Sequence, residues 1–332
     1  MRFLTGLLAL ALAGAVSACA LGTDPARDVG VRIADFGDNP GRLRMYKYVP
    51  QDLPPAPAMV VVLHHCFQYA ADYVEEAGWV SLADRYGFVL LMPEEVPLND
   101  LNLCFDSYSG SDARGRGEAE SIREMIERMV VDHKVDRQRI FVTGLSSGGS
   151  MALMMLAAYP EIFAGGGAVG SVTFGCTSIV FGMVPCLAVG EDKEPQEWGD
   201  IVRAASPHQG PWPIVSVWHG DADIVTNPDN AEETVEQWTN VHGTDAVPDL
   251  IEQVEGYPRY VYEDSAGRAV VEYYSITGMG HSVPIDLKRG CGDSRDGVGD
   301  FVSDMHICSS LYMAKFWGLV ADPGAAAVSS TK

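Results

Sequence analysis

Short runs of apolar residues alternate along this chain with longer segments of helical periodicity. The runs at 59–63, 88–92 and 139–143 are rich in β-branched residues and carry few polar side chains. Such runs are typical of strands buried on both faces of a parallel sheet. Apolar residues in 122–130 recur at i, i+3, i+4, i+7 and i+8, which predicts an amphipathic helix. The alternation predicts an α/β fold, with a mostly parallel central sheet and helices on both faces.

Weaker patterns complete this outline. Pro93 is expected to end the strand at 88–92, because proline cannot donate to a sheet ladder. No internal repeat or low-complexity linker divides the chain, so one catalytic domain is expected over 28–320 and a disordered tail over 321–332. The remaining predicted elements are a helix at 147–159 and strands at 43–48, 186–189, 214–218 and 270–276.

Residues 1–20 have the features of an export signal. A positive charge precedes the apolar segment 3–16, which is too short to span a bilayer. Val16-Ser17-Ala18-Cys19 resembles a lipoprotein box, in which Cys19 is acylated after cleavage. Ala18-Cys19-Ala20 equally fits the small-residue rule for ordinary secretion. Both interpretations predict export, either free or lipid-anchored at the cell surface or in the periplasm, with acylated Cys19 as the sole membrane attachment.

Charge and cysteine content narrow the classes of function. The net charge of −22 would repel phosphate backbones, so nucleic acid is not expected as a partner. Six cysteines remain beyond Cys19, and an even number in an exported protein predicts disulfides, although six allow 15 connectivities. The sequence contains neither C-x-x-C nor a histidine pair at metal-ligand spacing, so no metal site and no cofactor are expected. The sequence predicts no oligomeric state.

The segment Gly144-Leu145-Ser146-Ser147-Gly148 is a G-x-S-x-G motif between a predicted strand and a predicted helix. That context marks the nucleophile turn of α/β-hydrolases, where glycines let strand and helix approach closely. The turn lifts the Ser146 hydroxyl to a helix N-terminus, where negative charge is favoured. Ser146 is therefore the candidate nucleophile.

A serine nucleophile needs a base and a carboxylate that orients it, and this fold orders them serine, acid, histidine. Asp223 follows the predicted strand at 214–218, and Asp221 is the competing candidate. His281 stands in a glycine-rich loop after the strand at 270–276, as a general base would. The backbone N–H of Ser147 is the first expected oxyanion donor, and the second should come from His65 or Cys66.

A series of motifs resembles the poly(3-hydroxybutyrate) depolymerase family, which is related to feruloyl and acetylxylan esterases. The resemblance covers about residues 30–320, in order. Its main segments are Leu63-His64-His65-Cys66-Phe67-Gln68, Asp112-Ala113-Arg114-Gly115-Arg116-Gly117-Glu118-Ala119, Gly144-Leu145-Ser146-Ser147-Gly148-Gly149, Trp218-His219-Gly220 with Asp223, and Gly278-Met279-Gly280-His281.

The resemblance implies that Ser146, Asp223 and His281 form the catalytic triad, and that Cys66 supplies the second oxyanion amide. It also implies a Cys66–Cys104 disulfide. The other two expected pairs, Cys176–Cys186 and Cys291–Cys308, join cysteines that are close in sequence.

Two departures from the family pattern stand out. His65 occupies a position where the family usually has glycine, which is expected to reshape the oxyanion loop or add a donor to it. Asp106-Ser107-Tyr108 follows Cys104, where an aromatic residue is usual.

The expected function is that of an exported serine esterase that acts on short-chain hydroxyacyl esters, with poly(3-hydroxybutyrate) or its oligomers as substrate. A feruloyl or acetylxylan esterase is the alternative within the class. The alternative from another class is a non-catalytic, lipid-anchored binding protein on the same fold, which a complete triad in the correct order disfavours.

Overall fold

We describe a computed structural model of this chain, covering residues 29–107, 113–176, 184–292 and 301–320. The predicted signal at 1–20, the predicted tail at 321–332 and Tyr108 lie outside these residues. No helix within the described ranges is both long and apolar enough to cross a membrane.

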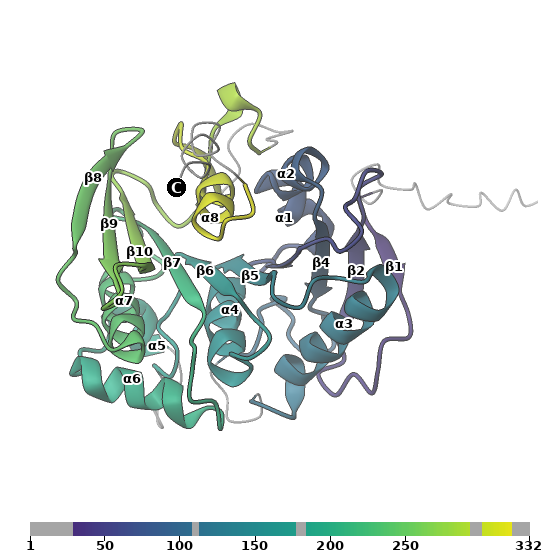
Figure 1. The fold of residues 1–332 in the computed structure, drawn as a ribbon, viewed down its shortest axis with the longest axis horizontal. Coiled ribbons are helices and arrows are strands. Elements are labelled where there is room, and N and C mark those ends of the chain that lie inside the picture. The colour runs from purple at the N-terminus through teal and green to yellow at the C-terminus, as the bar shows by residue number, and fades with distance from the viewer. Residues whose placement is uncertain (1–28, 108–112, 177–183, 293–300, 321–332) are drawn as a thin grey trace, which may run out of the picture.

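A ten-stranded sheet runs through the described part of the molecule, in the order β1-β2-β4-β3-β5-β6-β7-β10-β9-β8 (Figure 1). Its six central strands are parallel, and the pairs β1–β2, β2–β4, β10–β9 and β9–β8 are antiparallel. The strands are β1 (Val31–Ile33), β2 (Arg44–Tyr48), β3 (Met59–Leu63), β4 (Val89–Glu94), β5 (Ile140–Leu145), β6 (Gly165–Val169), β7 (Ile214–Gly220), β8 (Leu250–Val254), β9 (Tyr257–Glu263) and β10 (Ala269–Ile276).

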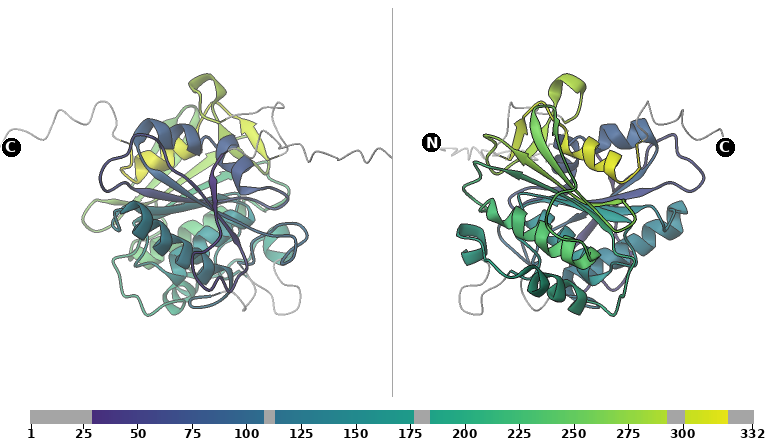
Figure 2. Two further views of the ribbon diagram at one scale, coloured as in Figure 1. Left: turned by 90° about the vertical axis from the view of Figure 1, so that its right-hand side faces the viewer. Right: turned by 60° about the vertical axis from the view of Figure 1, so that its left-hand side comes forward.

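Helices cover both faces of this sheet, as the alternating pattern predicts. In Figure 1, α1, α2 and α8 lie on one side, and α3, α4, α6 and α7 lie on the other. The views in Figure 2 show α8 beside the much earlier α1 and α2, and the Trp79 ring stacks on that of Trp317 at 5.8 Å. The helices are α1 (Ala70–Glu76), α2 (Trp79–Tyr86), α3 (Gly117–His133), α4 (Ser147–Ala158), α5 (Val184–Ala188), α6 (Pro195–Ala204), α7 (Asp229–His242) and α8 (Ser309–Phe316).

The core has two layers because successive strand residues point to opposite faces. In β3, Met59, Val61 and Leu63 pack with α3 and α4, whereas Val60 and Val62 pack with α1, α2 and α8. A small parallel pair, β11 (Val283–Ile285) and β12 (Val302–Asp304), and the short 3₁₀ helix η2 (Leu287–Arg289) lie near α8 in the sequence. Burial on both faces explains why the central strands read as continuous apolar runs.

Two sequence-based expectations are wrong. The predicted strand at 186–189 is instead part of α5, since a short apolar run does not distinguish a strand from a helical turn. Pro93 does not end its strand, because β4 continues to Glu94. Pro93 pairs with Met45 of β2, beyond the point where β3 pairs with β4, so no ladder hydrogen bond to β3 is lost.

Candidate active site

Ser146 occupies a strained turn between β5 and α4. Its backbone has φ +57° and ψ −119°, a conformation that residues with a side chain rarely adopt. The Ser146 amide donates to the carbonyl of Val169 at 2.9 Å, and its carbonyl begins α4 by accepting from Ser150 N. The turn therefore holds Ser146 at the carboxyl edge of the sheet, directly before a helix N-terminus.

Gly148 explains why this turn needs glycines. A Cβ at Gly148 would lie 2.3 Å from the Leu63 carbonyl oxygen and 2.5 Å from that of His64. Real Cβ atoms do not approach backbone oxygens so closely, so only glycine lets α4 begin against the end of β3. The start of α4 is thus packed directly on the loop that is expected to carry the second oxyanion donor.

His281 and Asp223 meet through two interlocked loops. The Nδ1 of His281 lies 2.7 Å from Asp223 Oδ2, and both side chains are buried. The same loops are joined by a bond from Ala222 N to the Met279 carbonyl at 3.1 Å. Asp221 Oδ1 accepts from Gly278 N at 2.6 Å, so the competing carboxylate fastens the histidine loop and is not the one bonded to the imidazole.

The strand order brings these residues to one edge. Ser146 follows β5, Asp223 follows β7 and His281 follows β10, and the carboxyl ends of parallel strands share an edge. Gly170, which follows β6, connects them: its Cβ would stand 3.4 Å from His281 Nδ1, and the preceding Val169 binds the Ser146 amide. This role cannot be predicted from the sequence, because Gly170 follows a glycine-rich strand whose residues have low β-propensity.

Asp223 is held as a carboxylate. Its Oδ1 accepts from the amides of Val225 and Thr226, and its Oδ2 accepts from His281 and faces His219 Nε2 at 3.2 Å. Burial alone would raise the pKa of Asp223, but the hydrogen bonds from His219 and His281, and the charge of His281, hold that pKa well below its usual range. In the sequence, His219 stands in the Trp218-His219-Gly220 segment that carries the family resemblance, but neither this segment nor the spacing of four residues to Asp223 predicts its contact with the carboxylate.

Two histidines at the end of β3 shape the adjacent loop. His64 Nδ1 lies 2.8 Å from the His65 carbonyl, and its Nε2 accepts from Glu95 N at 3.0 Å. His64 therefore fixes the peptide group whose N–H belongs to Cys66. A trans peptide directs that N–H away from the carbonyl that His64 binds. Burial lowers the pKa of His64 to about 4, so the ring is neutral at pH 7.

His65 extends the same arrangement by one residue. Its Nδ1 lies 2.6 Å from the Cys66 carbonyl, so the Nδ1 hydrogen is used within the loop rather than offered to a substrate. Its Nε2 is buried and finds no hydrogen-bond partner in the described structure, and its ring packs on Phe301 at 4.4 Å. Burial lowers the pKa of His65 to about 4 as well.

Three disulfides join the cysteine pairs expected above: Cys66–Cys104, Cys176–Cys186 and Cys291–Cys308. The first ties the loop after β3 to the loop after β4. Phe67 N reinforces that connection by donating to the Asn102 carbonyl at 2.6 Å. The backbone at Cys66 is thus restrained by the disulfide of its own side chain and by the hydrogen bond of Phe67 N. The imidazoles of His64 and His65 restrain it further through the carbonyls of His65 and Cys66.

The remaining histidines bind groups elsewhere. His133 faces Lys47, His208 faces the Pro211 carbonyl, His242 faces the Pro213 carbonyl, and His306 lies near Asp304. Trp218 is a core residue whose ring stacks on that of Tyr274 at 3.8 Å, and Met151, Met154 and Met155 lie in the core on the other face of the sheet.

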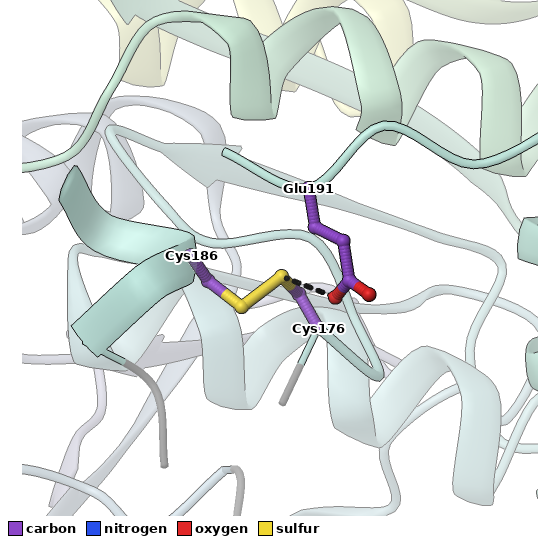
Figure 3. Close-up of side chains that lie close together, drawn as sticks. All are labelled: Cys176, Cys186 and Glu191. Carbon is purple, nitrogen blue, oxygen red and sulfur yellow. Dashed lines mark hydrogen bonds between the residues drawn. A yellow bond between two sulfur atoms is a disulfide. The ribbon is translucent and has the colours of Figure 1, made fainter. Parts of the chain in front are cut away.

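Two groups of metal-ligand residue types occur within the described residues. Figure 3 shows the first, where Cys176 Sγ lies 3.4 Å from Glu191 Oε2. Cys176 is bonded to Cys186, and a disulfide sulfur carries neither a hydrogen to donate nor the thiolate charge that binds metals. The second group is Asp286, Asp304 and His306, but the Asp286 carboxylate already accepts from Arg289 N at 3.2 Å and pairs with the Arg289 guanidinium.

Comparison with known proteins finds esterases. A family model described as "Esterase PHB depolymerase" matches residues 47–248. Poly(3-hydroxyalkanoate) depolymerase C of Paucimonas lemoignei is 40% identical over 292 residues, which cover 87% of this chain and 70% of that protein. Feruloyl esterase B of Talaromyces stipitatus is 32% identical over 266 residues, which cover 77% of this chain and 73% of that protein.

A solved structure shares the fold over nearly its whole length. The acetyl xylan esterase from Aspergillus awamori superposes with a TM-score of 0.75 at 27% sequence identity. The match covers 88% of this chain and 99% of that one.

Proposed function

Since this chain belongs to the esterase PHB depolymerase family and is a carboxylic ester hydrolase with the α/β-hydrolase fold, we propose that it is an exported enzyme that cleaves short-chain hydroxyacyl esters, foremost poly(3-hydroxybutyrate) or its oligomers. The observation that carries the mechanism is the buried His281–Asp223 pair, at the same sheet edge as the strained Ser146 turn.

In the proposed mechanism, the Ser146 hydroxyl oxygen attacks the ester carbonyl while His281 takes its proton through Nε2. The Nδ1–H of His281 stays bonded to Asp223, which orients the ring and stabilises its cationic form. The tetrahedral intermediate collapses, the C–O bond breaks, and His281 returns the proton to the leaving alkoxide. Water then attacks the acyl-enzyme with His281 again as base, which releases the acid and restores Ser146.

The oxyanion forms against the amides of Cys66 and Ser147 in this proposal. Ser147 N stands at the start of α4, where the helix dipole favours negative charge. The Cys66 amide belongs to the peptide that His64 fixes through the His65 carbonyl. Donors fixed before the reaction stabilise the transition state without a reorganisation cost.

Exposed apolar side chains support a water-insoluble substrate. Leu98 and Leu101 follow β4, Phe67 follows β3, and Ile224 directly follows Asp223 after β7; Ile224 is 97% exposed. Four strand spacings separate β4 from β7, roughly 19 Å at about 4.8 Å each, and Ser146, which follows β5, lies between them. A neutral polyester can contact such side chains on both sides of the nucleophile, whereas acetylated xylan presents mostly hydroxyl groups.

The three disulfides support the proposal of export, because such bonds persist in oxidising compartments. Residues 1–20 are the proposed signal, with lipid anchoring at Cys19 as one form of that export.

Feruloyl and acetylxylan esterase activity is the second candidate, favoured by the acetyl xylan esterase structure with a TM-score of 0.75. The deciding experiment measures kcat/KM for a hydroxybutyrate trimer, methyl ferulate and acetylated xylan on one preparation, together with hydroxybutyrate release from amorphous polymer. We expect the trimer and the amorphous polymer to be preferred. A clear preference for ferulate or xylan, with no hydroxybutyrate released, would replace the depolymerase proposal with the second candidate.

A further inference from the structure

The imidazoles of His281 and His219 lie against the same carboxylate oxygen of Asp223. Asp223 Oδ2 lies 2.7 Å from His281 Nδ1 and 3.2 Å from His219 Nε2. The same nitrogen of His219 lies 3.0 Å from the carbonyl oxygen of Thr226. The proposed mechanism accounts for His281, but it assigns nothing to His219, which lies in β7 and is 1% exposed.

The surroundings of His219 Nε2 determine where its hydrogen lies. Both near neighbours of this nitrogen, the Asp223 carboxylate and the Thr226 carbonyl, accept hydrogen bonds and have none to give. Nε2 must therefore carry a hydrogen, which it shares between the two oxygens. The ring thus acts as a donor that joins the carboxylate to the far end of its own loop.

With the His219 N–H, each carboxylate oxygen of Asp223 has two hydrogen-bond donors. Oδ1 accepts from the amides of Val225 and Thr226 at 2.8 and 2.9 Å, while Oδ2 accepts from the two imidazoles. The carboxylate side chain is 0% exposed, so water does not replace a lost donor readily. Among the described residues, removal of His219 would leave His281, the group that Asp223 has to orient, as the sole hydrogen-bond partner of Oδ2.

We infer that His219 is a positioning residue for ester hydrolysis, which fixes Asp223 Oδ2 so that the carboxylate holds His281 in one orientation. His219 touches neither substrate nor Ser146 in this scheme, and it acts only through Asp223. The inference rests on the proposed roles of Asp223 and His281.

A purely structural role is the competing explanation. A buried imidazole near the end of a strand can fill space and satisfy the Thr226 carbonyl, and its loss would then destabilise the loop whatever residue stands at 223. The two explanations differ in one respect. A positioning residue needs the carboxylate in order to matter, whereas a structural residue does not.

The test is a double-mutant cycle on a soluble p-nitrophenyl ester. His219→Phe keeps an aromatic ring at this position but removes the N–H. Its kcat and KM are measured both in the wild-type background and in Asp223→Asn. With Asp223 present we expect kcat to fall roughly 10- to 100-fold, with KM changed less than about twofold. With Asp223→Asn the same substitution should cost less than about twofold in kcat, because the group through which it acts is already gone.

Two amide variants keep the test decisive if His219→Phe does not fold. In His219→Gln the amide nitrogen stands near the position of Nε2, and we expect it to retain most of the wild-type kcat. In His219→Asn the amide is too short to reach Oδ2, and we expect a kcat as low as that of the Phe variant. The matched control is His242→Phe, which removes a histidine bonded to the Pro213 carbonyl and is expected to keep full kcat.

The outcomes separate the inference from the function beneath it. Equal losses in both backgrounds, or a His219→Phe enzyme within twofold of wild-type kcat, would overturn the positioning role while leaving the triad in place. Equal kcat for His219→Gln and His219→Asn would overturn it as well. If Asp223→Asn alone kept wild-type kcat, Asp223 would not be part of the triad. The proposed function would then lose its mechanism, and the inference about His219 would be overturned with it.

Discussion

The Nδ1 of His281 lies 2.7 Å from Oδ2 of Asp223, although 58 positions separate the two residues in the sequence. The contact forms because β7 and β10 are adjacent parallel strands, so that the loops following them meet at one edge. Bonds between the Asp221–Ala222 segment and the Gly278–Met279 segment then fix the register of the two loops.

Substitution of each loop acid should distinguish their roles. We expect Asp223→Asn to lower kcat by roughly 10⁴-fold, because the imidazole loses the acceptor that sets its tautomer. Asp221→Asn removes the negative charge but keeps a side-chain oxygen that can accept from the Gly278 amide, so we expect kcat to fall by at most about tenfold. Both variants are compared by steady-state kinetics on one soluble ester. A greater loss of kcat in Asp221→Asn than in Asp223→Asn would instead make Asp221 the carboxylate that orients His281.

Much of this arrangement can be predicted from the sequence, where pattern and chemistry agree. The run Met59–Leu63 is a strand with the predicted bounds, because burial on both faces leaves a continuous apolar signal. The glycines around Ser146 and the chain order of serine, acid and histidine predict residues that the fold brings to one edge.

Other features depend on tertiary packing and leave no local signal. Strand β6 begins with three glycines, because a Cβ at Gly166 would lie 2.7 Å from the side chain of Leu156 and one at Gly167 would lie 2.6 Å from that of Met313. The close approach of α4 and α8 thus selects against the residues that mark strands. The donor role of His219 depends likewise on a loop conformation that spacing does not predict.

Removal of each disulfide should show whether it supports catalysis by holding the Cys66 loop or only stabilises the fold. Replacing both Cys66 and Cys104 by alanine should lower the free energy of unfolding by roughly 2–4 kcal/mol and also lower kcat, since the proposed oxyanion amide belongs to Cys66. Replacing both Cys176 and Cys186 should lower stability but leave kcat within about twofold. Urea unfolding and steady-state kinetics measure the two effects. Equal kcat in both double variants would argue against a catalytic role for the braced loop.

The buried histidines His64 and His65 should make the fold sensitive to acid. Each has its pKa lowered from 6.5 to about 4, so the unfolded chain binds protons more readily than the folded one between these values. Stability contributed by the neutral rings is complete above pH 6.5 and is lost as the pH falls towards 4. For each ring, the free energy of unfolding should fall by roughly 2 kcal/mol between pH 7 and pH 5.

The matched variant for this pH effect is His65→Gly. Its free energy of unfolding should fall less between pH 7 and pH 5 than that of the wild type, by roughly 2 kcal/mol, when both are measured in urea. An unchanged pH dependence in this variant would show that His65 does not titrate as its burial implies.

The exposed leucines that follow β4 should matter for hydrolysis of polymer but not of soluble esters. We expect Leu98→Ser combined with Leu101→Ser to slow hydroxybutyrate release from amorphous polymer by roughly tenfold, because apolar contact area is lost. kcat/KM for a hydroxybutyrate trimer should stay within about twofold of wild type. Val131→Ser, on the exposed side of α3, is the control and should change neither rate. Parallel losses on trimer and polymer would exclude a separate contact surface.

The central claim is that Ser146 is the nucleophile, and active-site labelling tests it most directly. Wild-type enzyme and Ser146→Ala are incubated with a serine-directed organophosphonate, and intact mass and ester hydrolysis are measured together. We predict that the wild type gains one phosphonyl group at Ser146 and loses activity in step with labelling. Ser146→Ala should stay unlabelled, retain its unfolding transition and hydrolyse esters at least roughly 10⁴-fold more slowly. A folded Ser146→Ala enzyme that keeps a tenth of wild-type kcat, or that is labelled as fast as wild type, would contradict the claim.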